Sequence, residues 1–488
     1  AEKTSVEQTL AKVIGAYKRE DGYLEGSGYL VSWCVGHLVS LVPPDGYDPK
    51  YSRWRQEDLP IIPEKWKWEV SSGKKEQYEV LKALMFREDV DEIICATDAG
   101  REGELIFRLV YNQTGCRKPF QRLWISSMED QAIAEGFDNL RDGHEYDSLY
   151  QAALCRSEAD WLVGMNATRL FTTLYHHRLT VGRVPSPTLA MLTARNLQIA
   201  NFQKQKYYNL HLTTPVLNAV QEKIPDEKQA SDICRKCDGQ TAVVESVSQT
   251  EKKINQPRLY DLTSLQREVN RYLGYTAAQT LEYTQSLYEK KLVTYPRTDS
   301  QFLTDDMQET AEQMACLARA DLGFPEIPPE ELDIARVLNS SKVSDHTAII
   351  PTAQIEGTER SALTEGERNV LLLIEYRLLC ATGLAHRYQE TDILISCAGE
   401  KFKAKGKTIL DAGWKAYEDR LKVQIRKKQP KQADNPDEAE KTGEQALPEL
   451  AEGQTLGPVQ TDVSEHFTSP PKQYTEDSLL AAMETAGN

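Results

Sequence analysis

The stretch from residue 90 to residue 110 constrains the fold of this chain most strongly. The run VDEIICAT at 90–97 predicts a short buried strand, and the polar turn Asp98-Ala99-Gly100-Arg101 follows it directly. Four apolar residues then recur at helical spacing and predict a helix that begins near Glu102: Leu105, Ile106, Leu109 and Val110. A strand, a turn and a helix in this order form an α/β unit, and open α/β sheets place their sites at such turns.

This turn is rich in carboxylates. Asp98, Glu102 and Glu104 lie within seven residues, and oxygen ligands of this kind suit Mg²⁺. The dipole of the helix also favours acidic side chains at its N-terminus. The spacing alone favours an ordinary solvated turn. Gly100 and Gly103, together with the arginine between the acids, favour a metal site instead.

The chain of 488 residues is long enough for several domains, because one hydrophobic core rarely serves more than about 300 residues. Helical patterns occupy 150–200, 263–292 and 365–385, and strand-rich patterns occupy 207–250 and 388–425. Thr4, with Glu7 three residues later, predicts a capping box at the start of a first helix. The segment 427–453 is polar and poor in aromatic residues, so we expect a flexible insertion there.

The net charge of −16 argues against a protein that coats nucleic acid, because phosphate contacts require Lys and Arg. An enzyme with a local basic groove stays compatible with that charge. The sequence contains no run of about 18 apolar residues and no secretory signal. The nine cysteines offer no zinc-site spacing beyond the single pair Cys234 and Cys237. We therefore predict reduced thiols and a cytoplasmic protein that does not enter a membrane, and we expect that the chain is truncated at both ends.

A second candidate site lies at Tyr295-Pro296-Arg297-Thr298-Asp299-Ser300. A tyrosine phenol can store the energy of a broken phosphodiester as a phosphotyrosine ester. Its pKa near 10 makes it a weak nucleophile, and a cation such as Arg297 can lower that pKa and bind phosphate. Tyr295 is one tyrosine among 22, however, and most tyrosines simply pack in a core.

Several further segments, taken in order, resemble type IA DNA topoisomerases of the bacterial topoisomerase III branch. The resemblance extends over nearly the whole chain. Besides the strip around Tyr295 it rests on Trp33-Cys34-x-Gly36-His37-Leu38, Arg122-Leu123-Trp124-Ile125-Ser126-Ser127, Arg156-x-x-Ala159-Asp160-Trp161-Leu162-Val163-Gly164, Val181-Gly182-Arg183-Val184-x-Ser186-Pro187-Thr188, Asp261-Leu262-Thr263-Ser264-Leu265-Gln266, Ala278-Gln279-x-Leu281-Glu282-x-x-Gln285-x-Leu287-Tyr288 and Asp345-His346-Thr347-Ala348-Ile349-Ile350-Pro351-Thr352.

The acidic turn resembles the Asp-x-Asp-x-Glu signature of the Toprim domain. Gly100 stands where that family has its middle Asp, which is expected to weaken metal binding or to leave Glu104 or a water to complete the shell. Glu2 matches the Glu that the family carries at the end of its first strand, although the sequence shows no strand before it.

The resemblance implies a multidomain fold with α/β, α and β parts, in which a Toprim domain joins a ring of four domains. The expected spans are a Toprim domain at 1–150, a helical strand-binding domain at 151–203 and 467–488, a β-rich arch at 204–257 and 386–466, and a helical domain with the tyrosine at 258–385.

It also implies ATP-independent, Mg²⁺-dependent breakage, passage and rejoining of single-stranded DNA, with a 5′-phosphotyrosine on Tyr295. No Gly-rich Walker loop is present. The other expected catalytic residues are Glu2 as proton donor and acceptor, Lys3 and Arg297 at the transition state, and His346 at the scissile phosphate. The expected metal ligands are Asp98, Glu102, Glu104 and Glu2. The expected DNA contacts are Arg156, Asp160, Arg183, Ser186, Thr188, Thr298 and Asp299, with helix capping as the alternative role of Arg183.

The expected partners are single-stranded DNA and underwound duplex DNA, bound by a monomer. Two alternatives remain open from the sequence. A Toprim-type nuclease or primase would use the acidic turn without a covalent tyrosine. A DNA-binding relic without catalysis would account for the departure at Gly100.

Overall fold

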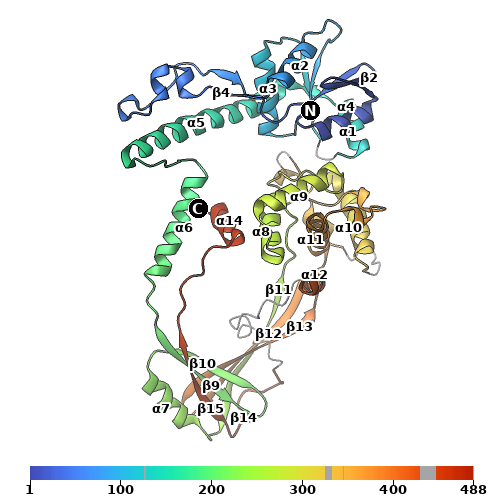
Figure 1. The fold of residues 1–488 in the computed structure, drawn as a ribbon. Helices are drawn as coiled ribbons and strands as arrows, with labels where there is room; N and C mark the ends of the chain where they lie inside the picture. The colour runs from blue at the N-terminus through green and yellow to red at the C-terminus, as the bar shows by residue number, and fades with distance from the viewer. Residues whose placement is uncertain (126–127, 325–331, 344–345, 429–446, 487–488) are drawn as a thin grey trace.

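The computed structural model describes residues 1–125, 128–324, 332–343, 346–428 and 447–486. Its elements form a ring (Figure 1). An N-terminal α/β domain lies at the top, helix α5 (Asp147–Tyr175) extends sideways from it, and helix α6 (Pro185–Ala200) descends along that side. A β-arch closes the bottom of the ring, and a helical domain lies between the arch and the N-terminal domain on the other side.

The N-terminal domain contains the α/β unit that the sequence predicts. Strand β6 (Ile93–Cys95) pairs in parallel with β7 (Phe120–Arg122), which pairs antiparallel with β8 (Arg141–Asp142). Two antiparallel sheets accompany it, formed by β1 (Lys18–Glu20), β2 (Tyr23–Gly26) and β3 (Tyr29–Ser32), and by β4 (Val39–Leu41) and β5 (Trp68–Val70). The helices are α1 (Thr4–Ile14), α2 (Lys75–Met85), α3 (Arg101–Thr114) and α4 (Asp130–Asp138).

The predicted capping box at the first helix is wrong. Thr4 is already helical, Lys3 occupies the N-cap position, and its side chain makes no cap hydrogen bond. Glu7 is only 2% exposed, because burial of Val6 and Leu10 turns this face of α1 toward the interior. Burial raises the pKa of the Glu7 carboxyl, and the ammonium group of Ala1 partly offsets that shift.

The helical domain is built from α8 (Leu262–Leu273), α9 (Ala277–Glu289), α10 (Gln308–Asp321) and α11 (Glu365–Thr382). Helices α8, α9 and α11 each begin with a capping box, at Asp261, Thr276 and Thr364. One apolar core joins these helices to the N-terminal domain, since it includes Val6 and Leu123 as well as Leu287 and Tyr288. The two domains therefore meet through packed side chains.

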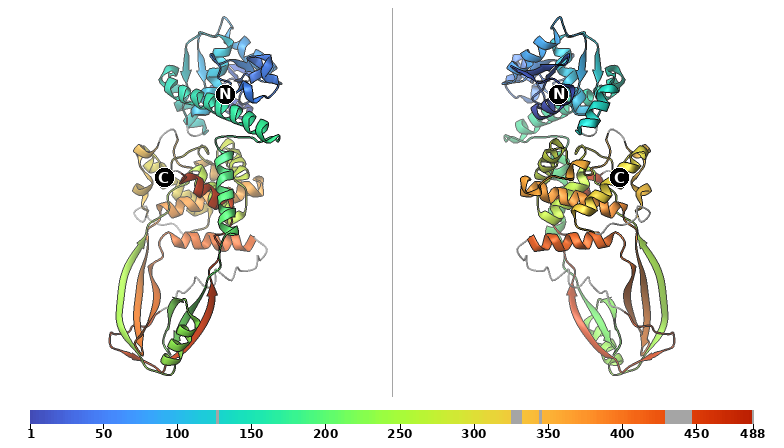
Figure 2. Two further views of the ribbon diagram at one scale, coloured as in Figure 1. Left: turned by 90° about the vertical axis from the view of Figure 1, so that its left-hand side faces the viewer. Right: turned by 90° about the vertical axis from the view of Figure 1, so that its right-hand side faces the viewer.

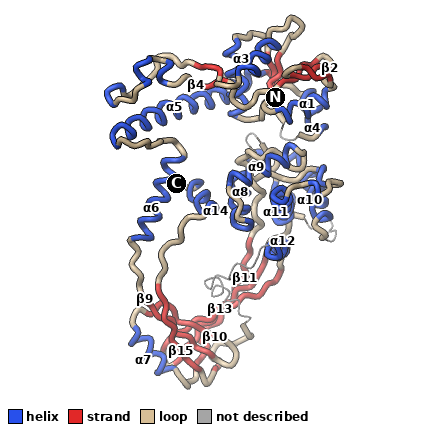
Figure 3. Tube along the Cα trace, in the orientation of Figure 1, coloured by secondary structure: helices blue, strands red, loops and turns tan. Residues whose placement is uncertain are grey.

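The arch is a seven-stranded antiparallel sheet in the order β14-β11-β12-β13-β10-β9-β15. Its strands are β9 (Lys206–Thr213), β10 (Asn218–Ile224), β11 (Ala242–Ile254), β12 (His386–Cys397), β13 (Glu400–Asp411), β14 (Thr455–Leu456) and β15 (Gln460–Phe467), with helix α7 (Glu227–Cys237) beside them. The arch has its own core, which includes Leu210, Ile395 and Phe402. Figures 2 and 3 show its long strands extending away from the helices.

The strand-rich expectation for 388–425 is wrong at its end. Residues Lys415–Lys428 form helix α12, because Leu421 and Ile425, one helical turn apart, are buried in the core of the helical domain. Helix α14 (Glu476–Glu484) also packs on this domain, where Asp477 pairs with Arg267 at 3.0 Å. Most of the predicted insertion, 429–446, lies outside the described residues.

All nine cysteines lie in the described part of the chain and are free thiols. Cys237 and Cys397 face each other across α7 and β12, each sulfur within 3.6 Å of the other residue's carbonyl oxygen. Within the described ranges, no helix has the length and apolar character needed to cross a membrane.

Candidate active site at the domain junction

Tyr295 lies in an extended strip that follows α9. The strip runs beside residues 348–351, where the Thr294 amide donates to the Ile350 carbonyl at 3.0 Å and the Thr294 hydroxyl to that of Ala348 at 2.9 Å. The Tyr295 side chain is 6% exposed, and the ring of Tyr288 packs edge-on against it at 5.4 Å. Backbone pairing and ring packing thus hold this tyrosine at the surface of its domain that meets the N-terminal domain.

The two regions singled out by the sequence meet here. The Tyr295 hydroxyl donates a hydrogen bond of 3.1 Å to Oδ2 of Asp98, a residue 197 positions away. Burial raises the pKa of the Tyr295 phenol, and the Asp98 carboxylate raises it further, whereas Arg297 lowers it in part. The Tyr295 phenol therefore keeps its proton near neutral pH.

His346 lies against the same tyrosine. Its ring is 4.3 Å from the Tyr295 ring, and its Nε2 donates to the carbonyl of Ala99. The indole of Trp124 is nearly parallel to the imidazole at 6.1 Å. The imidazole is thus held between the tyrosine strip and the acidic turn, next to the Tyr295 ring.

Glu2 and Lys3 reach the junction from the segment before α1. Burial raises the pKa of the Glu2 carboxyl, Asp98 raises it further, and Lys3 and Arg297 lower it in part. A carboxyl that keeps its proton more readily than usual suits a general acid. The Lys3 ammonium group forms an ion pair with Glu289 at 3.1 Å, so it links the N-terminal domain to the end of α9.

The four predicted metal ligands are not all together. Glu2 and Asp98 interact electrostatically, whereas the Glu102 carboxylate lies 3.5 Å from Nε2 of His37. That contact with His37 is the main cause of the lowered pKa of Glu102. Across the described ranges, no three His, Cys, Asp or Glu side chains form a group able to hold a metal ion. Two carboxylates with water can hold a hard cation, and Glu2 and Asp98 are the two predicted ligands that interact with each other.

Glu104 does not fit the predicted role of metal ligand. Its side chain is 1% exposed, Oε1 lies 2.7 Å from Nε of Arg122, and Oε2 lies 3.3 Å from Nε of Arg108. Burial raises the pKa of its carboxyl despite the two arginines. Both carboxylate oxygens thus face buried arginines.

Four predicted DNA contacts lie on α5, on α6 or in the segment between these helices: Asp160, Arg183, Ser186 and Thr188. Arg183 does not cap a helix with its guanidinium; it pairs with Asp160 of α5 at 2.9 Å, and both side chains are exposed. The Ser186 hydroxyl accepts from the Gly182 amide at 3.1 Å, and the Thr188 hydroxyl donates to the Val184 carbonyl at 2.7 Å. These two hydroxyls stabilise the beginning of α6.

The remaining candidates lie nearer to the junction. Arg156 on α5 lowers the pKa of Glu102, which indicates that α5 extends toward the acidic turn. Thr298 is buried, and its hydroxyl donates to the His346 carbonyl at 3.2 Å, whereas Asp299 is exposed. Thr298 thereby joins the strip of Tyr295 to the segment that carries His346.

Three residues at the site were not among the sequence candidates: His37, Glu289 and Arg122. His37 and Arg122 do occur in segments that carried the resemblance, at Gly36-His37 and Arg122-Leu123-Trp124. Glu289 is an ordinary polar residue at the end of a helix. Its spacing gives no sign of the ion pair with Lys3, which is 286 residues away.

Comparisons with known proteins show which family the chain resembles. A family model described as DNA topoisomerase matches residues 144–487, and one described as Toprim domain matches residues 1–128. The chain is 41% identical over 503 residues to DNA topoisomerase 3 of Bacillus subtilis (strain 168), with 99% of this chain and 66% of the relative covered. DNA topoisomerase 3 of Bacillus licheniformis matches to the same extent. The chain thus spans slightly less than two thirds of the length of these relatives.

The fold also matches a solved structure, that of full-length topoisomerase I from Thermotoga maritima. The TM-score is 0.70 at 23% identity, over 99% of this chain and 74% of that one. Toprim domains typically bind metal, in keeping with the carboxylates at the junction. Two family models that together cover nearly all of the sequence, and a shared fold, lead to one conclusion: the chain belongs to the type IA DNA topoisomerases.

Proposed function

We propose that this chain breaks and rejoins single-stranded DNA through a covalent 5′-phosphotyrosine on Tyr295, without ATP, and thereby relaxes or decatenates DNA. The observation that supports this most directly is the hydrogen bond between the Tyr295 hydroxyl and Asp98. It brings a nucleophile from one domain against a carboxylate from another. An enzyme that opens and recloses at a domain junction must carry its reacting groups on both domains.

In the proposed cleavage step, Oη of Tyr295 attacks the scissile phosphorus and the bond from phosphorus to the 3′-oxygen breaks. The phenol proton passes to Asp98, whose Oδ2 is 3.1 Å away. The leaving 3′-oxygen takes a proton from Glu2, whose carboxyl has a raised pKa. Lys3, Arg297 and His346 offset the charge on the phosphoryl oxygens. Rejoining reverses each of these transfers.

We propose Mg²⁺ as the metal, held by Asp98 and Glu2 with Glu102 beside them. When bound, it would supply positive charge that keeps the 3′-hydroxyl end near the phosphotyrosine. Asp98 would serve as a ligand only while its carboxylate is unprotonated, which in this scheme is the state before cleavage and after the proton has returned to Tyr295. Glu104 is left out of this set because its two oxygens are paired with arginines.

We further propose single-stranded and underwound duplex DNA as substrates of a monomeric protein. Arg156, Arg183 and the exposed end of the tyrosine strip at Asp299 supply the surface for a single strand, with Ser186, Thr188 and Thr298 holding that surface in shape. Asp160 would release Arg183 to phosphate when DNA binds, since their pair is exposed and therefore weak. The cytoplasmic location stays a prediction.

Trapping the covalent intermediate tests the proposal. End-labelled single-stranded DNA is incubated with the chain, the mixture is denatured rapidly, and label attached to protein is measured. Tyr295→Phe should abolish the attached label. Tyr288→Phe is the matched control, because this tyrosine is also buried and touches the Tyr295 ring. Label that persists in Tyr295→Phe contradicts the assignment, and metal-dependent cutting without attached label favours the nuclease alternative.

A further inference from the structure

We propose that Arg122 is a positioning residue for the reaction at Tyr295, because it fixes the backbone of the Asp98–Ala99 turn against the rest of the N-terminal domain. This inference rests on the proposed function at the same site. Glu104 supports this role, because its carboxylate is the counter-charge that keeps the Arg122 guanidinium in place.

Arg122 is the last residue of β7, and its side chain is fully buried. Its Nη1 donates to the carbonyl oxygens of three residues: Cys95 at 3.0 Å, Thr97 at 2.7 Å and Leu123 at 3.0 Å. Its Nη2 donates to the Asp98 carbonyl at 2.7 Å. A planar guanidinium with five N–H groups can serve several carbonyls at once, which a lysine ammonium cannot do in the same geometry. The carbonyls that end β6 and begin the turn thus converge on one side chain.

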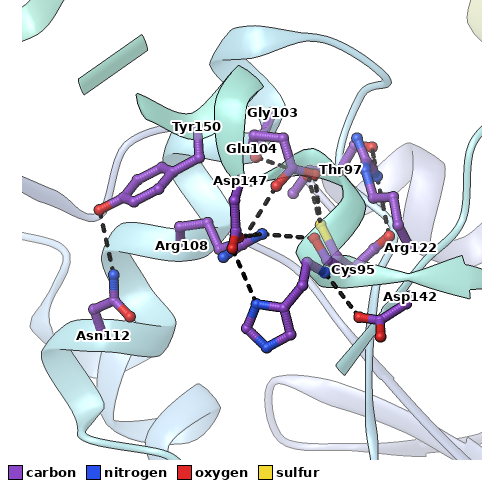
Figure 4. Close-up of polar contacts among 12 residues, drawn as sticks. Cys95, Thr97, Gly103, Glu104, Arg108, Asn112, Arg122, Asp142, Asp147 and Tyr150 are labelled. Atoms are coloured by element: carbon purple, nitrogen blue, oxygen red, sulfur yellow. Dashed lines mark hydrogen bonds and ion pairs between the residues drawn. The ribbon is translucent and has the colours of Figure 1, made fainter. Parts of the chain in front are cut away.

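Glu104 explains why this arginine can be buried. Its Oε1 is 2.7 Å from Arg122 Nε, and a buried cation without such a partner would be strongly unfavourable. Figure 4 shows Glu104 between Arg122 and Arg108. The Thr97 hydroxyl donates to the Gly103 carbonyl at 2.8 Å and ties the start of the turn to the first turn of α3.

The turn held in this way carries two of the contacts at the reaction centre. The Asp98 carboxylate accepts from the Tyr295 hydroxyl, and the Ala99 carbonyl accepts from His346. A displacement of the turn therefore moves the proton acceptor and the support of the imidazole together. Misplacement of reacting groups by about 1 Å can cost on the order of 100-fold in rate.

Arg108 offers a matched control within the same cluster. It is also buried, and its Nε lies 3.3 Å from Oε2 of the same Glu104. Its other polar contacts are the Gly143 carbonyl at 2.7 Å and Asp147 at 2.8 Å, neither of which belongs to the turn. Loss of Arg108 therefore removes a comparable buried ion pair and leaves the carbonyls of the turn with their partner.

The test compares Arg122→Lys with Arg108→Lys in the full chain, which keeps the buried charge in both variants. Amide hydrogen exchange is measured in peptides that cover residues 96–100, without DNA. Covalent adduct formation is measured at increasing DNA concentration. We expect Arg122→Lys to speed exchange in 96–100 and to slow adduct formation at saturating DNA by about 100-fold. The DNA concentration for half-maximal rate should be unchanged.

Arg108→Lys should lower the melting temperature by a similar amount and change neither exchange in 96–100 nor the rate. Equal effects of the two variants, or unchanged exchange in 96–100 in Arg122→Lys, would overturn the proposal. Amide hydrogen exchange is measured without DNA, so it tests the positioning role separately from DNA cleavage. If the unsubstituted chain forms no covalent adduct, the proposed function is refuted. The exchange data then still decide whether Arg122 holds the turn. Should Arg122→Lys fail to fold, Glu104→Gln should raise exchange in the same peptides, and unchanged exchange there overturns the proposal.

Discussion

Gly103 gives the sharpest test of how the acidic turn is built. A Cβ atom at this position would lie 1.9 Å from the carbonyl oxygen of Asp98, 2.9 Å from its carbonyl carbon and 3.1 Å from its nitrogen. An ordinary van der Waals contact begins near 3.4 Å, so the turn and α3 must separate by about 1.5 Å (3.4 − 1.9). The obstructing atoms belong to the backbone that carries the Tyr295 partner, and Arg122 holds that backbone from the other side.

The substitution Gly103→Ala should change the stability of the chain in two opposite ways. Alanine is favoured over glycine in a helix by about 1 kcal/mol, whereas overpacking at a buried contact costs about 1–3 kcal/mol. We expect the free energy of unfolding to fall by about 0–2 kcal/mol. Most molecules should therefore stay folded. The effect on the reaction should be larger, about 100-fold, because the displacement is greater than the 1 Å that suffices to disturb reacting groups.

The assay is the rate of covalent adduct formation at saturating single-stranded DNA, with a thermal melt of the same samples. Gly100→Ala is the control, since a Cβ there meets no atom within 4 Å and the backbone is extended, as any residue allows. Gly100→Ala should react at the parent rate. A Gly103→Ala protein that also reacts at the parent rate, or a Gly100→Ala protein that is equally slow, would refute the reasoning.

Two further predictions concern charge. Gly100→Asp adds a carboxylate between Asp98 and Glu102 in open space, so it should bind Mg²⁺ or Mn²⁺ several-fold more tightly by calorimetric titration; unchanged affinity would show that position 100 does not face the metal. Glu375 is buried beside Arg360, and burial raises the pKa of its carboxyl to about 7 from 4.5. The folded state then holds a proton that the unfolded state has lost, so the free energy of unfolding should fall by about 3 kcal/mol as pH rises from 4.5 to 7. In Glu375→Gln, the free energy of unfolding measured with denaturant should lack this fall with pH. An identical pH dependence in both proteins would exclude Glu375 as its source.

Much of the junction could be predicted because its key residues lie in contiguous segments. Asp98 was singled out by the acidic residues near it, and Tyr295 and His346 by segments that resemble those of the family. Their mutual contacts could not be predicted, since 197 residues separate Tyr295 from Asp98. The role of Arg122 could not be predicted for a different reason. Its partners are backbone carbonyls, which every sequence possesses.

Glu104 shows the opposite failure. The sequence places it beside Glu102, but side chains two positions apart on a helix point in different directions. Glu102 is exposed at the start of α3, whereas Glu104 lies beside Leu105 on the buried face. Helix α12 escaped prediction because its charged residues mask a narrow apolar stripe, of which Leu421 and Ile425 are the buried members.

One apolar core runs from α1 into the helical domain. It would make the free energy of opening this junction depend on temperature. Val6, Leu123 and Tyr288 belong to this core, so an opening of the junction, as the proposed function requires, would expose such side chains to water. Exposure of apolar surface carries a positive heat capacity, and its free-energy cost changes with temperature differently from that of breaking ion pairs. If the proposed passage opens this junction, burial of the same apolar surface would favour its closure again.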